Sequence, residues 1–261
     1  EYQANDDLSA IFAAGYNSAD NIELTGLGAG LSQGWTLGYY QARFLYKDWF
    51  AQIYQNWSDA GDTFLLRNGD PIVDNSKMTA MQVQHSTSLG KRQDFTYGID
   101  LFYTRPETEG TVNGQNEDTD DIDELGAYLQ SETSLAEILD LVLALRYDDH
   151  NRISDGEISP RAALVFKPSA TQTVRLTYNR AFATPSSLNL SLDLRSSPDA
   201  FGVGASFAPR LGFAPAIDVR AQGTFRKGFG NGFTFNRTAN GRPRFRTPFA
   251  PVLGLQPDAY F

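Results

Sequence analysis

Hydrophobic and polar residues alternate one by one over long parts of this chain, most clearly between residues 94 and 176. A strict period of two is typical of β-strands that have one apolar face. In the segment 138–148, one face holds Leu139, Leu141, Leu143, Leu145 and Tyr147, and the other holds Ile138, Asp140, Val142, Ala144, Arg146 and Asp148. A transmembrane β-barrel needs this arrangement, with an apolar face toward lipid and a polar face toward the lumen.

The same pattern predicts about ten strands, each near the length that a tilted strand needs to cross a bilayer. The predicted strands are 6–16, 21–31, 35–46, 49–57, 78–89, 94–104, 124–132, 136–148, 158–167 and 171–180. Short turns are expected at 17–20, 47–48, 90–93, 133–135 and 168–171, and long connections at 58–77, 105–123 and 149–157, with a short exception at 32–34. Outer-membrane barrels typically have short turns at one end, which face the periplasm, and long loops at the other end.

The predicted fold class is therefore all-β: an antiparallel up-and-down transmembrane β-barrel, of which this chain supplies about ten strands of a larger barrel. We expect residues 1–194 to form this partial barrel. Beyond Ala181 we identify no helix and no clear strand, and we expect residues 195–261 to be a long extracellular loop or a poorly ordered segment.

The amino-acid composition excludes some classes of function. The chain of 261 residues has 31 acidic and 22 basic side chains and a net charge of -9, which argues against a nucleic-acid partner. It has no cysteine, which excludes disulfides and thiolate chemistry. Aromatic residues make up 13%, as suits the aromatic girdles of a membrane barrel. Glu1 opens into polar sequence without a signal peptide, so we expect an internal piece of a longer protein.

Three stretches resemble the barrel of TonB-dependent outer-membrane receptors, and the likeness covers roughly residues 20–194. The stretches are TYGIDLFYTRPETEGTVNGQNEDTDDIDELGAYLQSE, SPRAALVFKP and RLTYNRAFATPSSLNL. The resemblance implies a barrel of about 22 strands with a plugged lumen. It also implies residence in outer-membrane lipid and energised uptake of a scarce solute, such as a siderophore, cobalamin, glycan or peptide. Coupling to the TonB complex would run through an N-terminal part that this chain lacks, because we find no plug and no TonB box.

Two other functions stay open beside this one: a passive outer-membrane porin or structural barrel, and a barrel enzyme. We expect no enzyme and no cofactor, because no nucleophile–base pair or metal motif is found. His85 and His150 are the only histidines and fall on different predicted hairpins, with His85 on the lipid-facing side.

A set of polar side chains on the predicted lumen face is the candidate solute path. The set comprises Gln41, Arg43, Gln52, Asn56, Gln82, Gln84, Asp100, Gln130, Glu132, Asp140, Arg146, Arg161 and Arg175. The alternative is that these residues pair with one another across strands and with a plug.

Two loops carry further candidates. The loop 107–124 is strongly acidic, and we interpret it as a solvated surface loop, with Asp118, Asp120, Asp121 and Asp123 as a weak candidate for Ca²⁺. Farther along, Arg226, Lys227, Arg237, Arg242, Arg244 and Arg246 alternate with phenylalanines, which is consistent with an extracellular recognition loop.

Overall fold

The computed structural model describes residues 2–5, 7–25, 28–153, 156–199, 202–212 and 218–223. Within these ranges the chain forms one antiparallel sheet of 11 strands and a separate two-stranded sheet. The large sheet contains β1 (Tyr2–Asn5), β2 (Leu8–Thr25), β3 (Gly28–Tyr46), β4 (Trp49–Asp59), β5 (Phe64–Leu65), β6 (Lys77–Leu89), β7 (Gln93–Arg105), β8 (Ile122–Ala136), β9 (Leu139–His150), β10 (Glu157–Ser169) and β11 (Gln172–Asn179).

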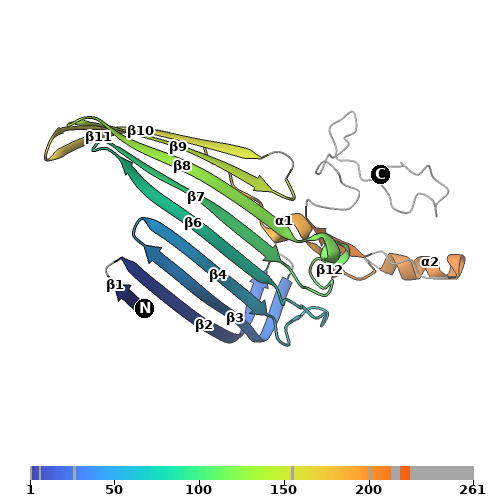
Figure 1. Cartoon of the computed structure of the whole chain (residues 1–261). Coiled ribbons are helices and arrows are strands. Elements are labelled where there is room, and N and C mark those ends of the chain that lie inside the picture. The colour runs from blue at the N-terminus through green and yellow to red at the C-terminus, as the bar shows by residue number, and fades with distance from the viewer. Residues whose placement is uncertain are drawn as a thin grey trace, which may run out of the picture.

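Strands pair with their neighbours in sequence, except that the short β5 pairs with β3, so that β4 pairs with β6. Figure 1 shows the sheet as one curved layer that bends around an open interior. Among the described residues β1 and β11 are the two edges, and every side chain of β11 is exposed. The strands thus form an open sector of barrel wall, which confirms the predicted fold class.

The two ends of the sheet differ in their connections. At one end, which we call the turn end, residues 47–48, 90–92, 137–138 and 170–171 join the strands in tight turns. At the other, the loop end, the connections 60–76 and 106–121 are long. One exception remains, because only residues 26–27 separate β2 from β3 at the loop end, and these lie outside the described residues.

The outer face of the sheet is apolar, as predicted from β9. Leu143, Leu145 and Tyr147 are 48%, 52% and 44% exposed, while the residues between them point inward. At the turn end of this apolar band, the ring of His85 stacks on Trp49 at 4.2 Å and meets the edge of Tyr97 at 5.4 Å. Rows of exposed leucines bordered by aromatic rings match the lipid-facing band of a barrel.

The prediction was wrong about the first strands. Residues 6–16 and 21–31 are not two strands joined by a turn at 17–20, because β2 runs through that segment and pairs Asn17 with Leu37 and Ala19 with Trp35. The expected connection at 32–34 is a bulge inside β3. Gly34 has φ +71°, its N–H binds the carboxylate of Asp20, and the register shifts by one residue there. The glycine and polar residues at 17–20 and 32–34, which we interpreted as turns, therefore belong to two continuous strands that contain a bulge.

Two smaller features also differ from the prediction. The hairpin between β8 and β9 turns at Glu137 and Ile138 rather than at 133–135, because β8 continues to Ala136 through an irregular register after Ser134. The strand β1 was not predicted at all. It is joined to β2 by a tight turn in which Asn5 Oδ1 accepts hydrogen bonds from the N–H groups of Asp7 and Leu8.

Beyond Ala181, where we predicted neither helix nor strand, the chain forms α1 (Ser187–Ser191), α2 (Val203–Leu211) and a small sheet of β12 (Asp193–Ser197) and β13 (Val219–Gln222). Figure 1 places α1 and β12 at the loop end of the large sheet. Leu65, Ile122, Leu190 and Leu194 are at most 6% exposed there. The described apolar core thus lies largely under the loops. None of the described helices has the length and apolarity that a membrane-spanning helix needs.

Candidate functional site

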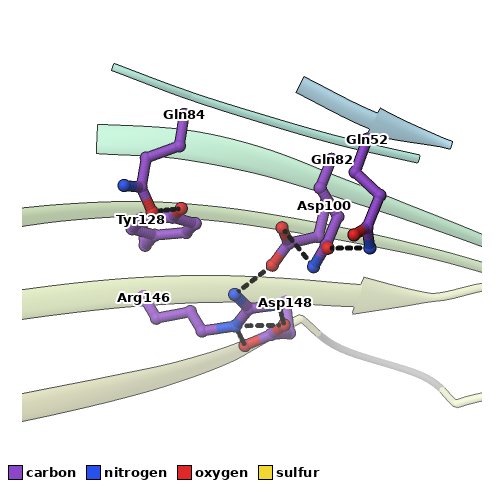
Figure 2. Close-up of polar contacts among 7 residues, drawn as sticks. All are labelled: Gln52, Gln82, Gln84, Asp100, Tyr128, Arg146 and Asp148. Atoms are coloured by element: carbon purple, nitrogen blue, oxygen red, sulfur yellow. Dashed lines mark hydrogen bonds and ion pairs between the residues drawn. The ribbon is translucent and has the colours of Figure 1, made fainter. Parts of the chain in front are cut away.

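A chain of hydrogen-bonded amides crosses the inner face of the sheet. Gln41 Nε2 donates to Gln52 Oε1 at 2.8 Å, and Arg43 Nε donates to the same oxygen at 3.2 Å. Gln52 Nε2 donates to Gln82 Oε1 at 3.0 Å, and Gln82 Nε2 donates to Asp100 Oδ1 at 3.3 Å (Figure 2). The side chains meet because Gln52, Gln82 and Asp100 are paired directly across β4, β6 and β7.

Arg146 extends this chain of contacts from β9. Its Nη1 lies 2.6 Å from Asp100 Oδ2, and its Nη2 lies 2.7 Å from Asp148 Oδ1. Asp100 is two strands away, so the guanidinium must pass over β8, where Gly126 lies directly between Asp100 and Asp148. A Cβ on Gly126 would lie 2.0 Å from Arg146 Nη2. A larger residue at position 126 would therefore displace the guanidinium from this position.

A second long side chain also passes over a glycine on a neighbouring strand. Tyr128 on β8 lies across Gly98 on β7, and its hydroxyl donates to Gln84 Oε1 on β6 at 2.8 Å (Figure 2). A Cβ on Gly98 would lie 2.6 Å from that hydroxyl oxygen. The guanidinium of Arg146 in turn sits 5.8 Å from the Tyr128 ring centroid. We call this connected set the inner network: Gln41, Arg43, Gln52, Gln82, Gln84, Asp100, Tyr128, Arg146 and Asp148.

Other members of the predicted set lie apart from the inner network. Asp140 pairs with Lys167 at 2.6 Å near the turn end, and Gln130 Nε2 donates to Glu132 at 2.8 Å. Asn56, Arg161 and Arg175 have no side-chain hydrogen bond or ion pair to any described residue. Sequence reasoning missed Tyr128, Gly98 and Gly126. A glycine inside a strand often marks close approach of another group, and that was the available signal.

The acidic loop is only in part the solvated segment that we predicted, because Glu107, Glu109, Asp118 and Asp121 are exposed but other residues of the loop are buried. It contains the 3₁₀ helix η1 (Gly114–Thr119), and Asn113 and Asp120, on either side of that helix, are each 2% exposed. Asn113 Nδ2 donates to Asp120 Oδ2 at 2.6 Å, while the backbone and hydroxyl of Thr108 both donate to Glu117. Burial raises the pKa of the Asp120 carboxyl to about 6. Neutral donors thus hold the carboxylates of Glu117 and Asp120 within the loop.

The four carboxylates of the weak calcium candidate do not converge on a common point. Asp120 is buried against Asn113, Asp118 is exposed, and Asp121 and Asp123 contact Arg105 at 3.5 and 2.5 Å. No group of metal-ligating side chains is found among the described residues. The described structure therefore does not form this candidate into a calcium site.

Asp193 ties the acidic loop to the segments that follow the barrel strands. Its Oδ1 accepts from Arg220 Nε at 2.6 Å and from Gln222 Nε2 at 2.8 Å, and its Oδ2 accepts from the Gln115 N–H at 3.1 Å. Burial alone would raise the pKa of the Asp193 carboxyl, but these hydrogen bonds outweigh it and hold the pKa below its usual value. We call the assembly of 60–76, 106–121, 187–197 and β13 the loop cap.

The histidines lie at opposite ends of the sheet. His85 is on the outer face at the turn end, and its Nδ1 is 2.9 Å from the Tyr97 hydroxyl. His150 ends β9 at the loop end and is 6% exposed; its Nδ1 accepts from the Arg152 N–H at 3.0 Å, and its Nε2 has no partner among the described residues. The two rings are therefore not brought into one site. The basic and aromatic stretch from Phe225 to Arg246 lies outside the described residues.

Comparison with known proteins gives one result. A family model described as TonB dependent receptor-like, beta-barrel, matches residues 2–245, which include the sheet, the inner network and the loop cap. No curated protein and no solved structure matches the chain.

Proposed function

Because the chain belongs to the TonB-dependent receptor β-barrel family, an outer-membrane receptor family, we propose that it forms the wall of a receptor that imports a scarce solute with energy from the TonB complex. The observation that carries this proposal is the two-sided wall. Leucines and aromatic rings cover its outer face, and the inner network covers its lumen face. Such a wall fits a barrel that sits in outer-membrane lipid and encloses polar contents.

In the proposed function, the predicted polar set lines the inside of the barrel. We propose that Arg161 and Arg175, whose side chains are exposed, meet the solute or a plug directly. Residues of the inner network already satisfy one another, so their role is to present a rigid polar surface. No covalent chemistry is part of the proposal. Residues 1–194 are proposed as the barrel part, and 195–261 as an extracellular segment.

The proposal is tested by uptake in cells that carry the full-length protein. The cells are given a mixture of ferric siderophores, cobalamin, glycans and peptides, and depletion of each compound is followed by mass spectrometry. We expect depletion of one compound class that requires both the receptor and an intact TonB complex. Depletion that continues without TonB contradicts energised import.

A second measurement addresses the competing porin function. The purified full-length protein is inserted into a planar lipid bilayer, and its ionic conductance is recorded. A receptor whose lumen is plugged shows no steady open-channel current, whereas a passive porin conducts continuously. Steady conductance together with TonB-independent solute leakage identifies a porin and overturns the proposal.

A further inference from the structure

A cavity of about 440 Å³ lies at the loop end, enclosed by the inner side of β3 and by the loop cap. Its size is in the range of small-molecule binding sites. The wall is mostly apolar, and its apolar side chains come from four separate segments of the chain: Trp35 from β3, Leu65 and Ile72 from the loop 60–76, Val112 from the acidic loop, and Leu188 and Leu194 from the segment after β11. The site exists only when these loops are assembled.

The bulge in β3 explains why there is room for this cavity against the sheet. On the turn-end side of Gly34 the odd-numbered residues of β3 face inward, which places the Trp35 indole in the cavity wall. On the loop-end side the even-numbered residues face inward, so Gly30 lines the cavity and leaves the room that a side chain would fill. A Cβ on Gly30 would have only one neighbouring atom within 4 Å, the Phe64 carbonyl oxygen at 3.8 Å.

The charges around the cavity are all of one sign. Glu23 and Asp74 are the charged residues among the described lining, and no lysine or arginine belongs to it. Asp74 is held by hydrogen bonds from Ser58 Oγ and from the Ser76 N–H. Glu23 is exposed and receives a single long hydrogen bond, from Asn21 at 3.3 Å. An anion entering here would lose its hydration beside two carboxylates, which is unfavourable.

We propose that this cavity binds the cargo of the receptor, and that the cargo is a largely apolar small molecule that is neutral or cationic. The inference rests on the proposed function for the fate of the ligand after binding. Binding itself follows from the cavity, its apolar wall and the two carboxylates in its lining, and it requires no energy from TonB. Negatively charged solutes, including anionic iron chelates, are excluded as ligands of this cavity.

Binding is tested with the full-length protein in lipid nanodiscs and with two probes that share one ring system. N-phenyl-1-naphthylamine is neutral, and 8-anilinonaphthalene-1-sulfonate is its anionic analogue. Energy transfer from Trp35 to the probe reports occupancy, and Trp35→Phe identifies the signal from this site. We expect saturable binding of the neutral probe and, in the same protein, binding of the anion that is weaker by about tenfold or more.

Two variants on the same strand separate binding in the cavity from partition into lipid. Gly30→Leu fills the cavity and is expected to weaken neutral-probe binding by about tenfold or more. Ala29→Leu adds the same side chain to the outer face and is expected to leave binding unchanged. Glu23→Gln is expected to bring the affinity of the anionic probe closer to that of the neutral one. Equal binding in Gly30→Leu and Ala29→Leu, or a preference for the anion, overturns the inference.

Measuring uptake in cells distinguishes a failure of this inference from a failure of the proposed function. If Gly30→Leu abolishes probe binding while TonB-dependent uptake of the cargo is unchanged, the cavity is not the cargo site and receptor function stands. If the neutral probe binds as expected but no uptake depends on TonB, the cavity stands and energised import fails.

Discussion

The barrel wall and the loop cap are built from the same chain by different rules. In the wall, each residue from β6 to β10 faces either lipid or lumen, and hydrogen-bonded ladders join every strand to its neighbours. In the loop cap, segments that are far apart in the sequence are connected by hydrogen bonds to individual buried side chains. Asp193, for example, accepts hydrogen bonds from Gln115, Arg220 and Gln222. We infer that the wall unfolds as one unit, whereas the cap opens locally.

The largest expected effect tests the lipid face of the wall. Leu143→Arg places a charge in the middle of the apolar band and is expected to cost about 2–4 kcal/mol of barrel stability. Ala144→Arg faces the lumen and is expected to cost less, and Leu143→Ala should also be mild because acyl chains fill the space. Stability is measured by denaturant titration of the full-length protein folded into lipid vesicles. If Leu143→Ala equals Leu143→Arg, or Ala144→Arg is the worst of the three, the membrane orientation is wrong.

The next effect tests the inner face of the wall. Gly126→Ala forces the Arg146 guanidinium away from Asp100, which is 6% exposed, and is expected to cost about 1–3 kcal/mol in the same titration. The control is the same substitution in an Arg146→Met background, where no guanidinium crosses β8. There the added cost of Gly126→Ala should be small. An unchanged cost in that background means that the glycine serves the backbone rather than Arg146.

A third substitution separates the cap from the wall. Asp193→Asn weakens the contacts to Arg220 and Gln222 and is expected to destabilise the cap by about 1–2 kcal/mol. Hydrogen exchange should rise in residues 108–120 and 187–197, while the midpoint of barrel unfolding stays the same. Asp70→Asn, which weakens the solvent-accessible pair with Arg195 and the hydrogen bond from Asn68, is the control and should change little. A parallel loss of barrel stability would show that cap and wall unfold together.

The smallest effect is a pH dependence confined to the cap. Because the pKa of Asp120 is raised to about 6 in the folded cap, the native state holds an extra proton between roughly pH 4 and 6. The cap is therefore expected to be more stable at pH 5 than at pH 7. The pKa of Asp193 is lowered, so its contribution is lost only as pH falls below about 4.

Hydrogen exchange of residues 108–120, corrected for the intrinsic rate at each pH, measures this difference. Asp120→Asn cannot titrate and should make protection equal at pH 5 and pH 7. Protection in the wall, for example across β7 and β8, should not follow the titration of Asp120. A cap that is better protected at pH 7 in the unsubstituted protein contradicts the assignment.

The same contrast explains how far the sequence could predict the structure. Alternation was sufficient in most of the wall, because lipid excludes polar side chains from the outer face, and in β9 the residues Leu139, Leu141, Leu143, Leu145 and Tyr147 all follow that rule. It failed at Gly34, where a bulge and a turn share the same composition. In the cap no period exists: Asp120 is buried against Asn113, and Asn116 donates to the carbonyl oxygen of Ser191, 75 residues away. Such contacts leave no local pattern in the sequence.

Arg146 has one mechanical consequence. Its side chain spans β8, so pulling β7 away from β8, or β8 away from β9, strains the pair with Asp100 as well as the backbone ladder at the parting seam. A force on the inner face of the wall is therefore distributed over β7, β8 and β9 instead of separating one pair of strands. The glycine at position 126 leaves room for this contact, which adds a side-chain link across β8 to the backbone ladders on either side of it.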